Sequence, residues 1–269
     1  EYYSPILFLI LGGAFIALTV ERTGMHRRIA LWILGFAGQS RFGLLLAFMA
    51  ATAFISMWIS NTSTSLIMMP IALAVLVAGG VADDETDGMA GALVLGVAFA
   101  ASLGGLGTLV GSPTNPIAVG LIEKQVGMNI SFADWSSFGI PILLVAVPVA
   151  AMILAKVQKI EATAFDPKAA RSAIGTQGAW TVAEMRLLPI ILLAITLWLA
   201  QPQLEALLPK GSVTDGTIAI ACSLLLFLVP DGSGRPLLNW KEADRAPWGV
   251  IMMFGGGLAL AAGISESGL

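Results

Sequence analysis

Long uncharged apolar runs recur along the chain and are separated by short polar segments. A helix that spans a bilayer needs roughly 20 predominantly apolar residues, and somewhat fewer at the short limit. Runs that approach this length occupy residues 5–20, 140–154, 187–200, 217–229 and 248–263. We interpret each run as a spanning helix, so the pattern predicts an all-α polytopic membrane protein.

Two further apolar stretches are too long for one simple span. Residues 42–82 are uncharged and are interrupted by Ser-Asn-Thr-Ser-Thr-Ser at positions 60–65. Residues 89–122 are also uncharged, and glycines and prolines break this run between positions 104 and 116. Irregular backbone at membrane depth is tolerated only where protein or a water-filled cavity covers it. Both stretches therefore predict discontinuous membrane helices, which secondary transporters use to build binding sites.

The polar segments give the predicted orientation. Residues 21–41 hold a short apolar stretch among basic residues, which we expect to lie along the membrane surface. Residues 162–183 and 230–247 are polar connectors. With this topology, all of the 14 Lys and Arg residues except Lys124 and Lys210 share one side. Because Lys and Arg are enriched in cytoplasmic loops, that side is predicted to be cytoplasmic.

Composition agrees with a membrane protein and excludes several functions. Of the 269 residues, 57% are hydrophobic and 12% are charged, whereas soluble domains carry about 25% charged residues. This argues against a soluble enzyme. The net charge of -3 offers no basic excess for a nucleic acid. Cys222 and His26 are single residues of their types, so we expect no internal disulfide, no zinc or haem site and no organic cofactor.

A weak internal repeat is also visible. A shift of about 244 positions places the Gly-Gly pair at 12–13 on the pair at 256–257, and Gly24 on Gly268. The two spans have opposite predicted directions, as in inverted-repeat transporters, although chance explains so few identities equally well. The chain begins without Met and ends after an apolar run. We therefore expect it to be part of a longer polytopic protein, with a counterpart of the Asn61 break near position ~305.

The break at residues 60–65 offers groups that can bind ions. Where a helix breaks, its last carbonyl groups and the first N–H groups of the next helix lack helical partners. The carbonyls can hold a dehydrated Na+, and the N–H end can hold an anionic oxygen. Ser56 lies one turn before Ser60 and faces the same break. The alternative interpretation is a polar contact between helices or an exposed turn.

The second break makes a binding site the better interpretation. Residues 104–116 cannot continue as a regular helix, because prolines lack a donor and glycines lower helix stability. No Gly-Lys-Ser/Thr sequence follows these glycines, so they are not a phosphate loop. Close helix packing alone does not require Ser112, Thr114 and Asn115 at this point. Two broken helices with hydroxyl and amide groups at their tips predict one shared site.

These residues resemble a known family. The sequence Phe-Ile-Ser-Met-Trp-Ile-Ser-Asn-Thr at 54–62 is followed by Met-Met-Pro at 68–70 and by Gly-Thr-Leu-Val-Gly-Ser-Pro-Thr-Asn at 107–115. Together they resemble the divalent anion:sodium symporter family, the INDY-type Na+-coupled dicarboxylate transporters. Residues 21–31 fit the segment before the re-entrant hairpin of that family. The resemblance covers essentially the whole chain.

The resemblance implies a re-entrant hairpin within residues 42–82, with its tip at residues 60–62. The implied Na+ ligands are Ser56, Ser60, Asn61 and the backbone carbonyl of Gly111. The implied substrate-binding residues are Asn61, Thr62, Ser112 and Thr114. At Thr114 the chain departs from the family, whose loop more usually has a second proline there.

The resemblance further implies an inverted-repeat, elevator-type transporter of the ion transporter superfamily that forms a homodimer in the bacterial inner membrane. Residues 1–41 would form a scaffold helix and an interfacial arm helix, and residues 42–160 a transport domain. Residues 161–185 would form a cytoplasmic connector. Residues 186–269 would supply scaffold helices of the second repeat, ending before its hairpin.

We therefore expect Na+-coupled transport of a divalent anion, above all a C4 dicarboxylate such as succinate, with malate, citrate and sulfate as other candidates. The two interrupted stretches contain no Asp, Glu, His, Lys or Arg, whereas proton-driven carriers usually keep a titratable relay in the membrane. Two alternatives stay open. One is a sodium/proton antiporter or oxyanion transporter of related architecture, and the other is a non-transporting membrane scaffold subunit.

Overall fold

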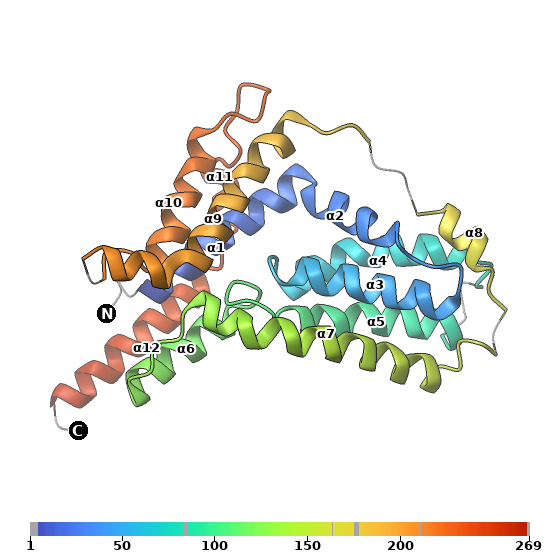
Figure 1. The fold of residues 1–269 in the computed structure, drawn as a ribbon, viewed down its shortest axis with the longest axis horizontal. Coiled ribbons are helices and arrows are strands. Elements are labelled where there is room, and N and C mark those ends of the chain that lie inside the picture. Colours follow the sequence, from blue (N-terminus) through green and yellow to red (C-terminus); the bar gives the residue numbers. More distant parts are fainter. Residues whose placement is uncertain (1–4, 83–85, 163, 175–177, 210, 268–269) are drawn as a thin grey trace. The chain divides into compact units, whose positions relative to one another are not determined.

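The structure is a computed structural model that describes residues 5–267 except 83–85, 163, 175–177 and 210. Its described residues form helices, with one isolated bridge between Pro230 and Pro236. The helices, labelled in Figure 1, are α1 (Pro5–Thr23), α2 (Met25–Leu34), α3 (Arg41–Ser56), α4 (Asn61–Ala78), α5 (Gly88–Gly104), α6 (Thr114–Val126), α7 (Phe132–Val157), α8 (Pro167–Ser172), α9 (Val182–Leu207), α10 (Asp215–Leu228), α11 (Trp240–Ala243) and α12 (Trp248–Ser267). The predicted all-α class is confirmed.

The predicted apolar runs correspond to helices. The five simple runs fall in α1, α7, α9, α10 and α12. Among the described residues, α1, α4, α7 and α9 are long and apolar enough to cross a membrane. The helices α3, α5 and α10 are apolar but shorter. The short apolar stretch within residues 21–41 forms α2.

Both predicted interruptions are present. The first long run is divided between α3, which ends at Ser56, and α4, which begins at Asn61. The second is divided between α5, which ends at Gly104, and α6, which begins at Thr114. The chain forms two compact units, and both breaks begin in the same one. Unit 1 comprises residues 1–23, 113–136 and 180–269, and unit 2 comprises residues 24–112 and 137–179.

Unit 1 is built around α1, which packs along α10 and also contacts α9. Gly12 allows this approach, because a Cβ atom built on it would lie 2.7 Å from the Cβ atom of Ala219. The ring of Phe132 stacks on the buried ring of Trp198, with centroids 4.6 Å apart. These contacts give unit 1 an apolar core of its own.

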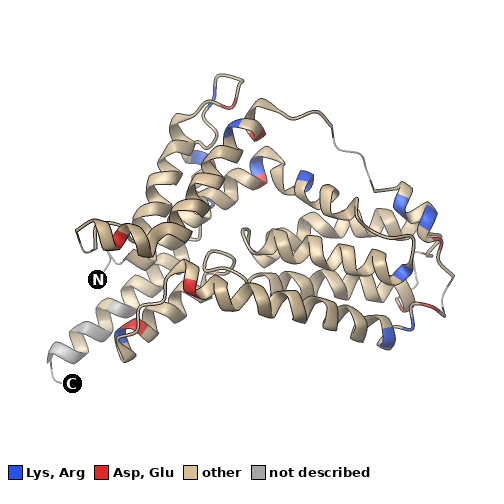
Figure 2. Ribbon diagram, in the orientation of Figure 1, with Lys and Arg blue, Asp and Glu red and all other residues tan. Residues whose placement is uncertain are grey.

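Arg22, at the end of α1, forms ion pairs with residues far along the chain in unit 1. Its guanidinium group lies 2.7 Å from the carboxylate of Asp231 and 3.0 Å from that of Glu242. It also donates to the carbonyl oxygens of Pro236 and Leu237. Hydrogen bonds from Ser233 and the nearby Arg22 hold the pKa of Asp231 well below its usual range. Figure 2 shows that charges lie mainly at helix ends and in loops, away from the middle of the apolar helices.

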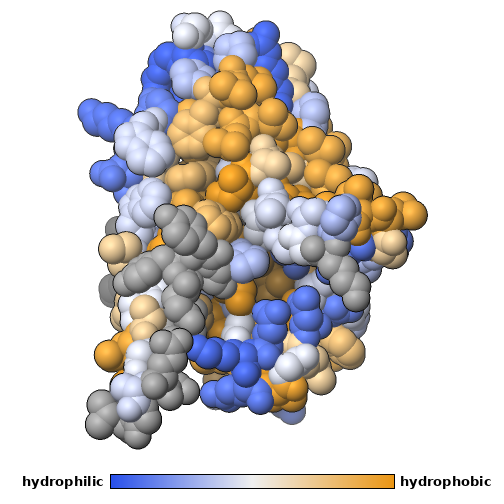
Figure 3. Space-filling view, turned by 90° about the vertical axis from the view of Figure 1, so that its left-hand side faces the viewer, coloured by the Kyte–Doolittle hydropathy of each residue, from blue (hydrophilic) through white to orange (hydrophobic). Residues whose placement is uncertain are grey.

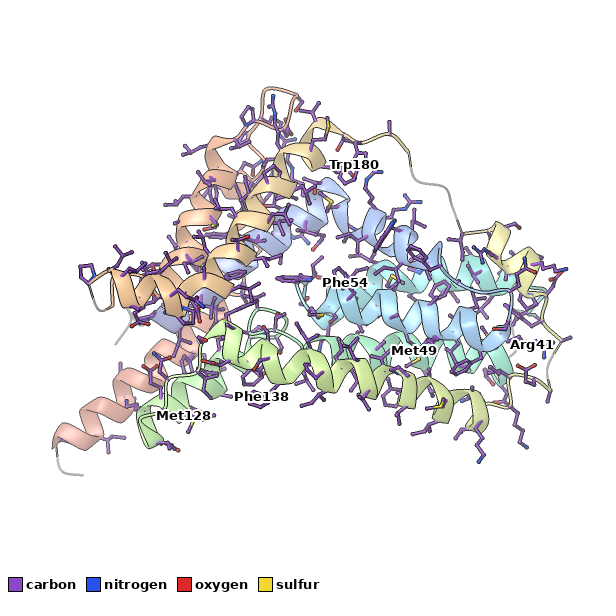
Figure 4. All side chains as sticks on the ribbon, viewed as in Figure 1. Arg41, Met49, Phe54, Met128, Phe138 and Trp180 are labelled. Atoms are coloured by element: carbon purple, nitrogen blue, oxygen red, sulfur yellow. The ribbon has the colours of Figure 1, made fainter. Side chains whose placement is uncertain are left out.

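Unit 2 is a helical layer in which α3 packs against α5, and α4 returns alongside α5. Small residues allow this contact, because a Cβ atom on Gly96 would lie 3.0 Å from Leu45 Cδ1 and 3.1 Å from Met49 Cγ. Figure 4 shows α3 running from Arg41 past Met49 to Phe54, close to the turn that leads into α4. The turn therefore lies at the end of a tightly packed helix pair.

A polar connector follows α7. Three arginines join it to the rest of unit 2 by hydrogen bonds. Arg41 donates to the carbonyl oxygen of Glu161 at 2.8 Å. Arg171, at the end of α8, donates to that of Gly35 at 2.8 Å. Arg28 donates to that of Ala179 at 2.8 Å. The connector predicted as a loop is thus held by charge-assisted hydrogen bonds, which are stronger than neutral ones.

Apolar side chains also cover much of the molecular surface. Only 22% of the most apolar window of α7 is buried, and Leu144 and Ile142 are more than half exposed. Figure 3 shows apolar residues gathered in a broad area of one face. Apolar patches of this kind are rare on soluble monomers and mark surfaces that contact lipid or protein.

Candidate functional site

The turn between α3 and α4 presents a capped helix N-terminus. Ser60 is the N-cap residue of α4, and its Oγ accepts a hydrogen bond from the backbone N–H of Ser63 at 3.3 Å. Serine is favoured at this position because its hydroxyl replaces a missing helical acceptor. The start of α4 carries the positive end of the helix dipole, which favours an anion. Thr62, in the first turn, is exposed.

Ser56 lies behind this turn and is fully buried. Its Oγ lies 2.6 Å from the carbonyl oxygen of Ala101 in α5 and 2.9 Å from Oδ1 of Asn61. A hydroxyl group has one proton, so Ser56 can donate to only one of these two acceptors at a time. Donation to Ala101 leaves the Ser56 oxygen and the Asn61 oxygen side by side.

Three backbone carbonyl groups meet at Gly111, in the loop between α5 and α6. A Cβ atom built on Gly111 would lie 2.8 Å from the carbonyl oxygen of Gly105 and 3.0 Å from those of Ser56 and Met57. Any other residue would push a methyl group among these oxygens, so glycine is required by the close approach. We call these three carbonyl groups, together with Gly111, the carbonyl cradle.

The cradle lies where two helices end. Ser56 is the last residue of α3 and Met57 is its C-cap, while Gly105 is the C-cap of α5. The C-terminal ends of helices carry partial negative charge and favour cations. Two such ends therefore contribute to one group of oxygen atoms.

Side-chain hydrogen bonds and close packing hold the loop against the turn. The hydroxyl of Thr108 donates to the carbonyl oxygen of Met57 and accepts from the N–H of Gly111 at 3.2 Å. A Cβ atom on Gly139 of α7 would lie 2.8 Å from the carbonyl oxygens of Leu106 and Gly107. The loop is thus held on both sides within unit 2.

The chemistry of this group suits an alkali cation. Its donors are uncharged oxygens, namely those of Ser56, Asn61 and the cradle. Hard cations prefer oxygen ligands, whereas transition metals are typically held by His or Cys. Within the described residues, no cluster of three His, Cys, Asp or Glu side chains could hold a metal ion.

The structure brings most of the predicted site residues into unit 2. Ser56, Asn61 and Gly111 surround the same small region. The Ser60 side chain is directed to Ser63, with the two hydroxyl oxygens 3.1 Å apart. Ser112 is half-buried and is the last residue of the α5–α6 loop that belongs to unit 2. Thr114 is exposed and begins α6 in unit 1.

Several groups at the candidate site were not predicted from the sequence. Ala101, Gly105 and Met57 contribute backbone carbonyl oxygens, which leave no side-chain signature. Thr108 lies inside the motif at 107–115, yet only its contact with Met57 reveals its function. Its polarity within an apolar run is the one signal that could have identified it.

Comparison with protein families matches the chain to the citrate transporter model, CitMHS, over residues 1–269. The sodium-dependent dicarboxylate transporters SdcS of Staphylococcus aureus strains USA300, NCTC 8325 and COL are each 38% identical to it over 285 aligned positions. The alignment covers all of this chain and 54% of each relative, so the chain spans about half their length. These matches confirm the resemblance to Na+-coupled dicarboxylate transporters and the predicted multi-pass membrane protein.

Proposed function

Because this chain belongs to the citrate transporter family, we propose that the protein moves a divalent anion across the membrane together with Na+. We favour a C4 dicarboxylate such as succinate as the substrate. The names of the Staphylococcus aureus relatives, sodium-dependent dicarboxylate transporters, support both the sodium ion and the dicarboxylate. The observation that carries the proposal is the meeting of two helix C-terminal ends at the carbonyl cradle beside Ser56 and Asn61.

In this proposal Na+ binds first. The Ser56 hydroxyl donates to the Ala101 carbonyl oxygen, which leaves its own oxygen and Asn61 Oδ1 directed to the ion. The Gly111 carbonyl and the cradle oxygens add backbone ligands, and Ser60 adds a hydroxyl when it leaves its capping position. Uncharged ligands leave the full positive charge of Na+ at the site.

The anion then binds beside the occupied cation site. Residues 42–82 and 89–122 contain no basic side chain, so the charge of the dicarboxylate must be balanced by Na+ and by helix ends. The first turn of α4 supplies N–H groups, and Asn61, Thr62 and Ser112 supply hydroxyl and amide donors. Coupling follows, because helix ends balance only part of the dicarboxylate's charge and bound Na+ supplies the rest.

We extend the proposal to the membrane arrangement. The α3–α4 pair would form a re-entrant hairpin in a transport domain of residues 42–160, which moves as an elevator against a dimeric scaffold. The scaffold would include residues 1–41 and 186–269, and residues 161–185 would be the cytoplasmic connector. The predicted location is the bacterial inner membrane.

Neither alternative function is favoured by the site. An antiporter that exchanges protons needs a titratable group in the membrane, and both broken stretches lack one. A scaffold subunit needs only hydrogen bonds between helices. It gives no reason for three carbonyl oxygens to meet at a glycine.

The direct test is uptake by the natural protein that carries this chain, expressed whole and reconstituted in vesicles. The Asn61→Ala variant should lose Na+-driven succinate uptake by at least about tenfold, because it removes a ligand shared by ion and substrate. Asn129→Ala is the matched control, since Asn129 lies exposed in the segment after α6. Wild-type uptake by Asn61→Ala would contradict the proposal and favour a scaffold.

A further inference from the structure

Thr64, in the second turn of α4, carries a buried hydroxyl group. The residue is 0% exposed, and within the described part of the chain its Oγ1 has no hydrogen-bond partner. Buried hydroxyl groups almost always have a partner, since leaving one unpaired costs free energy. This unpaired buried hydroxyl therefore requires an explanation.

Other threonines in this chain show what a helical threonine ordinarily does. Thr19, Thr52 and Thr196 each donate to the carbonyl oxygen four residues earlier, at 2.7–2.8 Å. Thr64 has the same option, because the carbonyl of Ser60 lies four residues earlier and accepts from the Thr64 backbone N–H at 2.9 Å. The Thr64 hydroxyl does not bond to this ordinary acceptor.

The position of Thr64 on α4 places it one turn from Asn61. Residues three apart on a helix share a face, so Thr64 lies directly below Asn61. The Asn61 oxygen is directed inward, toward Ser56 and Gly105. Helical side chains also lean toward the N-terminus of their helix, which inclines Thr64 toward the turn.

The neighbouring helix α5 has a backbone carbonyl oxygen at the level of Thr64. The end of α5 meets the start of α4, because a Cβ atom on Gly105 would lie 2.5 Å from Asn61 Oδ1. The two helices therefore run antiparallel, and one turn below Gly105 is Ala101, whose carbonyl oxygen lies 2.6 Å from Ser56 Oγ. Thr64, one turn below Asn61, is level with this pair.

From these contacts we propose that Thr64 is a further oxygen ligand of the cation that binds at the carbonyl cradle. The inference rests on the proposed function, since it assigns one more residue to the same site. The partner that Thr64 lacks is then the ion itself. The hydroxyl group lowers stability when the site is empty and gains its interaction when Na+ binds.

This role predicts two results for Thr64→Val, which replaces the hydroxyl with a methyl group of similar volume: unchanged or higher stability without Na+, and a weaker response to Na+. Without Na+, the variant should melt at the same temperature as the unsubstituted protein or higher, because an unpaired polar group is gone. The Na+ concentration for half-maximal thermal stabilisation should rise about tenfold. Thr64→Ser should keep a nearly normal Na+ response, because it retains the oxygen.

Thr19→Val is the matched control, because Thr19 is equally buried but its hydroxyl bonds within α1. All variants are melted as the whole natural protein in NaCl and in choline chloride. If Thr64→Val does not fold, Thr64→Ala and Thr64→Ser give the same comparison. An equal Na+ response in the valine or alanine variant and the unsubstituted protein would overturn the role of Thr64 alone. If the unsubstituted protein itself shows no Na+ response, the sodium site and this inference are both wrong.

Discussion

Thr108 donates a hydrogen bond to the backbone carbonyl oxygen of Met57, and this contact joins the two helix breaks of unit 2. The residues are 51 positions apart in the sequence. Met57 belongs to the turn after α3 and Thr108 to the loop after α5. The contact fixes one wall of the carbonyl cradle relative to the other.

Removing the Thr108 hydroxyl should loosen the cradle. In Thr108→Val the Met57 carbonyl loses a donor and the Gly111 N–H loses its acceptor. Each buried group left unpaired costs about 1–3 kcal/mol. We expect a lower melting temperature and weaker Na+ binding, measured by thermal unfolding in NaCl and choline chloride. Thr196→Val serves as the control, since Thr196 is exposed on α9. Equal losses in both variants would show that the contact has no special role.

A methyl group at Gly111 should block the cation site. The added Cβ in Gly111→Ala would lie within 2.8–3.0 Å of three carbonyl oxygens, so these oxygens must move apart. We expect Na+-driven uptake to fall by more than about tenfold, the loss that follows from about 1.4 kcal/mol of weakened binding. Gly249→Ala should be neutral, because nothing lies within 4 Å of its added Cβ. Normal uptake by Gly111→Ala would exclude the cradle as an ion site.

The Arg22 cluster should contribute more stability than a surface ion pair of unit 1. Arg22→Ala removes two carboxylate partners and two carbonyl contacts from a side chain that is 19% exposed. Breaking a buried pair costs about 3–5 kcal/mol, and partial exposure places this one at or below the lower end. Arg245→Ala breaks a pair whose arginine is 62% exposed, worth about 0–1 kcal/mol. Thermal unfolding of the two variants compares them directly, and a larger effect at Arg245 would reverse the ranking.

Asp215 should make unit 1 less stable as pH rises. Its Oδ2 accepts from the Phe132 N–H at 2.7 Å, while Oδ1 is buried without a partner in the described residues. Burial, with smaller effects from Asp134 and Glu205, raises its pKa from 3.8 to about 6. The folded state then binds more protons than the unfolded state, so this contribution is complete below pH 3.8 and is lost as pH rises through about 6.

The Asp215→Asn variant should remove that pH dependence. The asparagine can still accept from Phe132 but carries no charge, so its melting temperature should vary less between pH 4 and pH 7 than that of the unsubstituted protein. Asp87→Asn, at an exposed position before α5, is the control. Identical pH profiles for Asp215→Asn and the unsubstituted protein would show that Asp215 does not titrate in this window.

The sequence was sufficient to predict the helices and the positions of both breaks. Uncharged apolar length defines α1, α7 and α9, and the polar and Gly-Pro interruptions define the ends of α3 and α5. The placement of Ser56 and Asn61 together at the first break could also be predicted. The carbonyl contribution of Met57 could not, because a backbone oxygen has no residue-specific signal. Thr64 could not be predicted either, because its lack of a hydrogen bond is seen only in the structure, by comparison with threonines whose hydroxyls are bonded.

The central claim is that anion binding depends on Na+ held at the carbonyl cradle. Its most direct measurement is equilibrium binding of radiolabelled succinate to the whole natural protein, first in NaCl and then with Na+ replaced by choline at the same ionic strength. We predict that binding collapses in choline, because no basic side chain in the broken stretches replaces the lost charge. Succinate binding that persists unchanged in choline would contradict the account.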